Sequence, residues 1–178
     1  PTGRAPRIPG SHWIGKVVLP RLRRCLAVSP ERSHTAIIGY STGGRGAVLV
    51  AQHYQEFGLV AGFSGTYDLM DLKPGTGEYR IHAAVYGPQK QFVRRWAQEQ
   101  SVDPELVKKL RGAQVLLSHG KQDPVVPFTQ TTALVQAMKT AGLAPLERLD
   151  PDAAHDWAFW KREVAAAMKA FETLLRPA

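Results

Sequence analysis

The chain has 178 residues, 44% of them hydrophobic and 21% charged, which suits one globular domain with its own core and excludes a disordered or collagen-like chain. Its formal charge is +8, but the basic residues are scattered as pairs and no nucleic-acid motif is present, so we expect no nucleic-acid partner. No apolar run reaches about 18 residues, which predicts no membrane span. The single cysteine, Cys25, excludes an internal disulfide and a cysteine-based metal site.

The first third of the chain alternates helical and strand patterns. Pro, Gly and Arg dominate residues 1–10, which we interpret as a loose arm. Apolar residues then recur at helical spacing over 11–26, and Pro20 predicts a kink in this helix. The short apolar segment 35–39 predicts a strand that is covered on both faces, and 43–55 predicts a buried helix behind it.

The same alternation continues to the end of the sequence. Further strands are predicted over 59–63, 114–118 and 146–149. Helices are expected over 128–141 and 157–175, and the last has apolar residues at steps of three and four along one face. Residues 70–112 interrupt the pattern with turns and two short helical stretches, which we interpret as an excursion above the sheet. The alternation predicts an α/β fold with a mostly parallel sheet and helices on both faces, whose sites form at the carboxyl ends of the strands.

One of these strand ends carries a G-x-S-x-G motif, Gly39-Tyr40-Ser41-Thr42-Gly43, between an apolar strand and an apolar helix. This context is typical of a nucleophile elbow, in which a strained turn lifts the serine hydroxyl off the sheet. The residues two before and two after the serine are expected to need small side chains. The amide of Thr42, at the start of the helix, is a candidate oxyanion donor.

A serine hydroxyl needs a base, and the base needs an orienting carboxylate. His155 follows the last strand and precedes the last helix, whereas His119 is expected to be structural. Asp123 follows the strand over 114–118, so the order Ser41, Asp123, His155 is the chain order that this architecture requires. The rival carboxylates Asp68, Asp150 and Asp152 are expected to form turns and caps, and Asp156, next to His155 in the sequence, is expected to point elsewhere.

Four segments together resemble the esterase D group of α/β-hydrolases, which includes S-formylglutathione hydrolases, enterochelin esterases, feruloyl esterases and mycolyltransferase relatives. These segments are Gly39–Gly44, Phe63–Asp68, His119–Asp123 and the H-D-W-x-x-W sequence that begins at His155. The last favours this group over prolyl-oligopeptidase and dienelactone-hydrolase relatives. The resemblance covers about residues 11–175, and it implies an α/β-hydrolase fold with Ser41 as nucleophile, Asp123 as acid and His155 as base.

The sequence departs from the family at its amino-terminal side. The family has earlier strands, and a loop after one of them supplies a second oxyanion donor, but residues 1–178 contain no such segment. We therefore expect this chain to be the carboxyl-terminal part of one hydrolase domain. Without the earlier strands, residues 35–39 would form an open sheet edge, so we expect an amino-terminal segment or a partner chain to pair there.

The resulting hypothesis is a serine esterase that acts on a small ester or thioester through an acyl-enzyme, without a cofactor or a metal. Two alternatives remain open, an acyltransferase with the same triad and a non-catalytic binding protein with a hydrolase fold. Aromatic residues are the candidates for substrate binding: Tyr40, Tyr86, Trp96 and Trp157.

Overall fold

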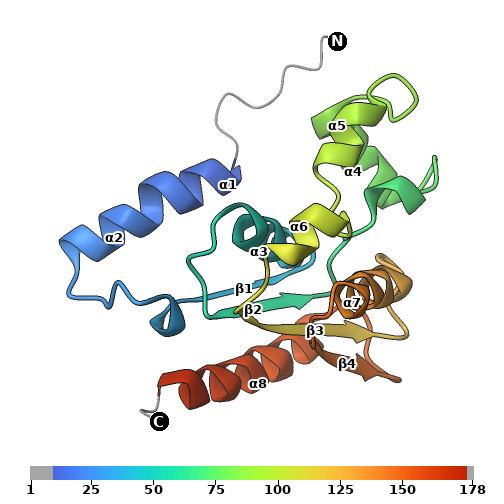
Figure 1. Ribbon diagram of the computed structural model, residues 1–178. Helices are drawn as coiled ribbons and strands as arrows, with labels where there is room; N and C mark the ends of the chain where they lie inside the picture. The colour runs from blue at the N-terminus through green and yellow to red at the C-terminus, as the bar shows by residue number, and fades with distance from the viewer. Residues whose placement is uncertain (1–9, 176–178) are drawn as a thin grey trace.

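The computed structural model describes residues 10–175 and contains a four-stranded parallel sheet (Figure 1). The strands lie in the order of the chain: β1 (Ala36–Tyr40), β2 (Leu59–Phe63), β3 (Gln114–Gly120) and β4 (Leu146–Asp150). Ala36 is opposite Leu59, and Leu59 is opposite Gln114, so the carboxyl ends of β1, β2 and β3 meet at one edge. The predicted parallel α/β architecture is confirmed.

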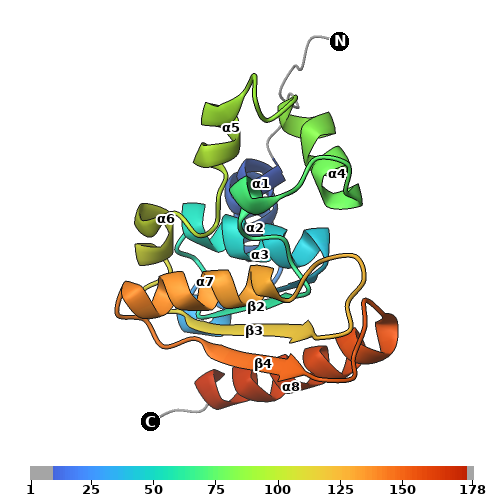
Figure 2. The same ribbon diagram turned by 90° about the vertical axis from the view of Figure 1, so that its right-hand side faces the viewer.

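Helices cover both faces of the sheet (Figure 2). One face carries α3 (Thr42–His53), α6 (Pro104–Lys108) and α7 (Thr129–Thr140), and the opposite face carries α8 (Trp157–Leu175). Each helix of the first layer lies on the crossover between two parallel strands, which is why consecutive strands run in the same direction. No helix within residues 10–175 is long and apolar enough to cross a membrane.

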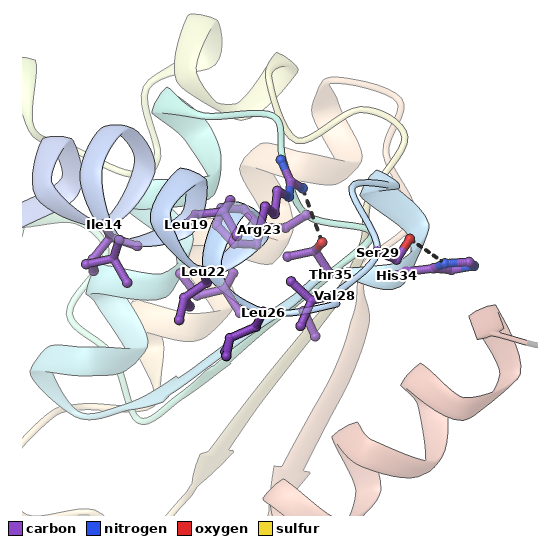
Figure 3. Close-up of a pocket in the computed structure, with 13 residues that line it drawn as sticks. Ile14, Leu19, Leu22, Arg23, Leu26, Val28, Ser29, His34 and Thr35 are labelled. Atoms are coloured by element: carbon purple, nitrogen blue, oxygen red, sulfur yellow. Dashed lines mark hydrogen bonds between the residues drawn. The ribbon is translucent and has the colours of Figure 1, made fainter.

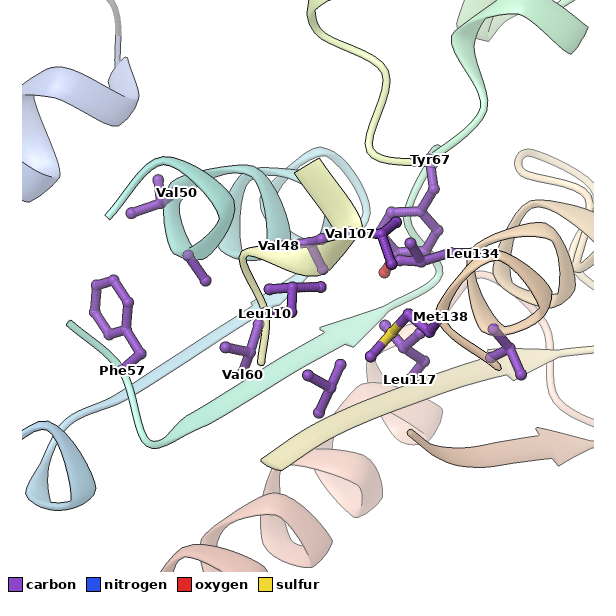
Figure 4. Packing of buried hydrophobic residues seen from close by; sticks show 13 residues of the cluster. Val48, Val50, Phe57, Val60, Tyr67, Val107, Leu110, Leu117, Leu134 and Met138 are labelled. Atoms are coloured by element: carbon purple, nitrogen blue, oxygen red, sulfur yellow. The ribbon is translucent and has the colours of Figure 1, made fainter. Parts of the chain in front are cut away.

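Side chains of β2 alternate between two hydrophobic clusters, one on each face of the sheet. Leu59, Ala61 and Phe63 pack with Phe159 on the side of α8. The other cluster lies under α3, α6 and α7, and Figure 4 shows Val60 of β2 among its members. All five residues of β2 are buried, because the strand is central in the sheet and both of its faces are covered by helices.

The edge strand β1 is only half buried, although its sequence predicted cover on both faces. Four of its five residues are partly exposed and Tyr40 is exposed. The cause is its position, because β1 pairs with β2 alone among the described residues. Its apolar side chains still alternate between the two clusters, Ile37 toward α3 and Ile38 toward α8.

The amino-terminal helix runs continuously from Gly10 to Cys25 with a change of winding inside it. It consists of α1 (Gly10–His12), a π-helical turn (Trp13–Val18) and α2 (Leu19–Cys25). The backbone N–H of Leu19 donates to Ile14 five residues earlier. Pro20 has no N–H, and its ring clashes with the carbonyl four residues before it, so the helix widens into a π-helical turn directly before this proline. The predicted kink at Pro20 stays a prediction. Of the predicted arm 1–10, only Gly10 lies within the described residues.

The segment between β2 and β3 contains a 3₁₀ turn (Leu69–Asp71) and the helices α4 (Gly77–Tyr86), α5 (Val93–Gln98) and α6. Helices α4 and α5 stand beyond the layer of α3 and α7, away from the sheet (Figure 2). They enclose a small apolar cluster of Leu69, Leu72 and Trp96. The segment therefore has three α-helices rather than the two expected, and the third returns to the main core through Val107.

Candidate active site

Ser41 lies on a sharp turn between β1 and α3. Its backbone has φ 53° and ψ −127°, which a residue with a side chain adopts only under strain. Three backbone hydrogen bonds hold this conformation: the Ser41 N–H donates to the carbonyl of Phe63 (2.8 Å), and the Ser41 carbonyl accepts from the amides of Gly44 (2.9 Å) and Arg45 (3.2 Å). The turn is thus tied to the end of β2 on one side and to the first turn of α3 on the other.

The glycines around Ser41 are not equally constrained. A Cβ at Gly39 would lie 2.0 Å from the carbonyl oxygen of Gly43, and a Cβ at Gly44 would lie 2.6 Å from the carbonyl oxygen of Phe63. A Cβ at Gly43 would meet nothing within 4 Å. The expectation that position 43 needs a minimal side chain is therefore wrong, because the close approach to β2 occurs one residue later, at Gly44.

Three side chains that are far apart in the sequence form one line of hydrogen bonds at the carboxyl edge of the sheet. The distance between Nε2 of His155 and Oγ of Ser41 is 3.0 Å, and Nδ1 of His155 donates to Oδ2 of Asp123 over 2.7 Å. Asp123 lies on the loop after β3, and His155 lies between β4 and α8. The fold thus brings together the nucleophile, base and acid candidates in the geometry of a Ser-His-Asp triad.

Asp123 is held as a carboxylate. Its side chain is fully buried, and burial raises the pKa, but hydrogen bonds from His119, His155 and the amides of Val126 and Val125 outweigh burial and lower the pKa to about 2. The two amides donate to Oδ1 (2.9 and 2.8 Å), which leaves Oδ2 for the imidazoles. An ionised acid is therefore available to orient His155 and to stabilise its protonated form.

His119 belongs to the same site, although its sequence context suggested a structural role. It is fully buried near the end of β3, and its Nε2 lies 3.2 Å from Oδ2 of Asp123. Its other contacts are with the carbonyl of Val126 and the hydroxyl of Thr131. The sequence did offer a signal that could have placed His119 near Asp123, because the two residues are four positions apart. A strand end and the loop that follows it bring residues at such a spacing together.

The rival carboxylates are occupied locally. Asp68 accepts from the amides of Met70 and Asp71 at the 3₁₀ turn. Asp150 accepts from the amides of Asp152 and Ala153, which lowers the Asp150 pKa. Asp156 accepts from the amide of Phe159 in the first turn of α8. Asp68 and Asp150 thus form the turns that were expected of them.

Aromatic rings surround the histidine side of the triad. The ring of Tyr40 stacks on Trp160 (centroids 4.6 Å apart) and meets Trp157 edge-on (4.9 Å). The ring of His155 also meets Trp160 edge-on at 4.9 Å, and the indole N–H of Trp160 donates to Ser64 (3.2 Å). Tyr40 is 38% exposed and Trp157 is 59% exposed, so both can contact a bound molecule.

The other two aromatic candidates lie in the segment above the sheet. Trp96 is completely buried and donates its indole N–H to the carbonyl of Gly87 (3.0 Å). Its proposed contact with substrate is therefore wrong for this structure, and Trp96 is a packing residue of the segment. The hydroxyl of Tyr86 accepts from Arg45 of α3 (3.1 Å), so Tyr86 ties the segment to the helix behind Ser41.

Thr42 is the first residue of α3, and it is exposed. The first amides of a helix have no partner within the helix, and the helix dipole favours negative charge there. Such an amide is suited to an oxyanion beside Ser41. Among residues 10–175, no cluster of three His, Cys, Asp or Glu side chains is placed to hold a metal ion.

Comparison with solved structures finds the same fold in enzymes longer than this chain. A ferulic acid esterase is 22% identical with a TM-score of 0.73, and the match covers 96% of this chain and 63% of the esterase. The acylaminoacyl peptidase of Pyrococcus horikoshii is 16% identical with a TM-score of 0.76, over 93% of this chain and 30% of the peptidase. A puromycin-hydrolyzing peptidase of Mycobacterium tuberculosis is 19% identical with a TM-score of 0.71, over 88% of this chain and 24% of the peptidase.

These likenesses show the α/β-hydrolase fold, as the sequence predicted, and the chain spans less than two thirds of each of these enzymes. No curated protein matches the sequence significantly. A family model described as Putative esterase matches residues 11–171, which include Ser41, Asp123 and His155. The chain therefore belongs to the Putative esterase family of α/β-hydrolases.

Proposed function

We propose that this chain carries the catalytic centre of a serine hydrolase that cleaves carboxylic esters or thioesters through an acyl-enzyme. The observation that carries the proposal is the unbroken line of contacts from Ser41 through His155 to Asp123, at 3.0 and 2.7 Å. Membership of the Putative esterase family supports an ester rather than an amide as the substrate.

In this mechanism, Oγ of Ser41 attacks the carbonyl carbon while Nε2 of His155 takes the hydroxyl proton. The tetrahedral intermediate collapses when His155 gives that proton to the departing alcohol or thiol, which leaves the acyl group on Ser41. His155 then takes a proton from water while the water oxygen attacks the acyl-enzyme, and it gives that proton to Oγ of Ser41 when the second tetrahedral intermediate collapses and releases the acid. Asp123 stays ionised throughout and stabilises the imidazolium.

The oxyanion of each tetrahedral intermediate would accept a hydrogen bond from the amide of Thr42. A second donor is expected from a segment beyond this chain, because such a hole uses two donors. Tyr40 and Trp157 are proposed to contact the substrate, since both are exposed beside His155.

We also propose that an additional strand pairs with the outer edge of β1. The backbone groups of this edge have no partner strand among the described residues. Beside it lies an apolar groove of about 380 Å³ between the amino-terminal helix and β1, and Figure 3 shows Leu22, Leu26 and Val28 along it. An open apolar edge next to an apolar groove suits an extended hydrophobic segment, supplied from upstream or by a partner chain.

The test is reaction of the purified protein with a fluorophosphonate, which phosphonylates activated serines. We expect the label on the peptide that contains Ser41, and we expect none in Ser41→Ala. The control is the chain labelled after denaturation, where the triad no longer exists. A folded protein that hydrolyses p-nitrophenyl esters without labelling at Ser41 would refute the assignment.

A further inference from the structure

The carboxylate of Asp123 is contacted by two histidines rather than one. Nδ1 of His155 and Nε2 of His119 both approach Oδ2, at 2.7 and 3.2 Å. His155 is part of the proposed triad, whereas His119 approaches from β3, on the inner side of the carboxylate. The side chains of both His119 and Asp123 are fully buried, so water does not compete for this contact.

The contacts of His119 place a proton on its Nε2 atom. Its Nε2 faces two acceptors, the carbonyl of Val126 (2.9 Å) and Oδ2 of Asp123, so a proton must lie on Nε2. Its Nδ1 lies 2.8 Å from the hydroxyl of Thr131 on α7, which is also fully buried. A neutral imidazole that donates from Nε2 and accepts at Nδ1 from Thr131 satisfies all three contacts.

We propose that His119 is a positioning residue of the catalytic site, which holds Oδ2 of Asp123 in the direction of His155 through its Nε2–H. The inference rests on the proposed serine hydrolase function but adds a residue that acts through the acid rather than on the substrate. Asp123 is then fixed on three sides: the amides of Val125 and Val126 hold Oδ1, and the two imidazoles share Oδ2.

The shared oxygen has a consequence for the base. The Nε2–H of His119, which Oδ2 shares with the carbonyl of Val126, withdraws negative charge from Oδ2 and weakens its attraction for the proton on His155. The groups that lower the pKa of Asp123 are these two histidines and the two backbone amides, which agrees with a carboxylate supported from within the protein. Without His119, Oδ2 would rotate more freely and would stabilise the imidazolium of His155 more strongly.

The experiment compares His119→Leu and His119→Gln in ester hydrolysis over pH 4–9. Leucine removes the donor, whereas the glutamine amide keeps an N–H near the position of Nε2. We expect His119→Leu to lose about 10- to 100-fold in kcat/KM, as for loss of a hydrogen bond to a charged group, with little change in KM. The acid limb of its pH profile should move to higher pH. His119→Gln should recover most of both effects, and the exposed His53→Gln serves as the matched control.

Unfolding curves show which variants keep the native structure. If His119→Leu folds and its kcat/KM and acid limb match the wild type, the proposal is overturned. If His119→Leu does not fold, Thr131→Val decides the question, because it keeps His119 but removes the hydroxyl that fixes its proton on Nε2. Folded Thr131→Val with a kcat/KM and an acid limb that both match the wild type would then overturn the proposal.

A second readout separates this inference from the proposed function. The downfield proton resonance of the His155 Nδ1–H reports its bond to Asp123 without any turnover. If wild type shows neither turnover nor labelling of Ser41, the proposed function fails, and the resonance still tests His119. A resonance that shifts or disappears in His119→Leu supports the positioning role, and an identical resonance contradicts it.

Discussion

Replacing Gly39 with alanine tests whether the tight turn is what presents Ser41. The new Cβ would lie 2.0 Å from the carbonyl oxygen of Gly43, where ordinary contact begins at 3.4 Å, so the backbone must open by 3.4 minus 2.0, or 1.4 Å. The obstacle is backbone rather than a flexible side chain, which means that the turn itself has to move. A displacement of this size would break the 3.0 Å contact between Ser41 and His155.

We expect Gly39→Ala to lose about 100-fold in the rate of fluorophosphonate labelling, because a misplacement of about 1 Å costs that much. Overpacking should also lower the free energy of unfolding by about 1–3 kcal/mol. Gly43→Ala is the matched control within the same motif. It meets open space, so it should label at nearly the wild-type rate and gain about 0.5–1 kcal/mol in helix stability. Equal labelling rates in the two variants would refute the steric account of the turn.

Further predictions concern the acid, the base, the aromatic support and the sheet edge. Asp123 has a folded pKa of about 2 against an ordinary 3.8, so it contributes about 2 kcal/mol to stability above pH 4. That contribution should fade as the pH falls from 4 to 2. Denaturant unfolding of wild type and of Asp123→Asn at these pH values measures it, and a difference in unfolding free energy between the two that stays constant would contradict the prediction. His155→Ala should lower the labelling rate of Ser41 about 10³- to 10⁴-fold while the circular dichroism stays native; labelling within tenfold of wild type would exclude His155 as the base. Trp160→Phe removes the hydrogen bond to Ser64 and should cost about 1–2 kcal/mol of unfolding free energy, and an unchanged midpoint of urea unfolding would show that this bond is not stabilising. The isolated 178-residue chain should self-associate in light scattering as its concentration rises, because the edge of β1 is open; a monomer that unfolds cooperatively would contradict the proposed additional strand.

The elements that were predicted well are those whose sequence pattern reports directly on burial. The strand over 59–63 and the helix over 157–175 have the bounds that were expected. Both depend on apolar spacing, since a central parallel strand is apolar throughout and a surface helix is apolar along one face. The three triad candidates were found from the G-x-S-x-G motif and from their positions after predicted strands, because sheet topology brings the carboxyl ends of neighbouring strands together.

The residues that were misjudged depend on three-dimensional contacts that spacing does not encode. The apolar pattern of β1 predicted cover on both faces, because an apolar strand looks the same at the edge and at the centre, and its open edge was expected only from the departure from the family. Gly43 and Gly44 are adjacent glycines, and only the approach of Phe63 distinguishes them. Trp96 was placed in the substrate site by its aromatic side chain, but it is completely buried, whereas His119 is buried as expected and its contact with Asp123 was not foreseen.

The most direct test of the triad is to trap the acyl-enzyme. The protein is mixed with p-nitrophenyl acetate, quenched in acid within the first turnovers, and digested for peptide mass analysis. The account predicts one acetyl group on the peptide that contains Ser41, together with loss of p-nitrophenol release in Ser41→Ala. Acetyl transfer to another residue, or release at the wild-type rate in folded Ser41→Ala, would contradict it.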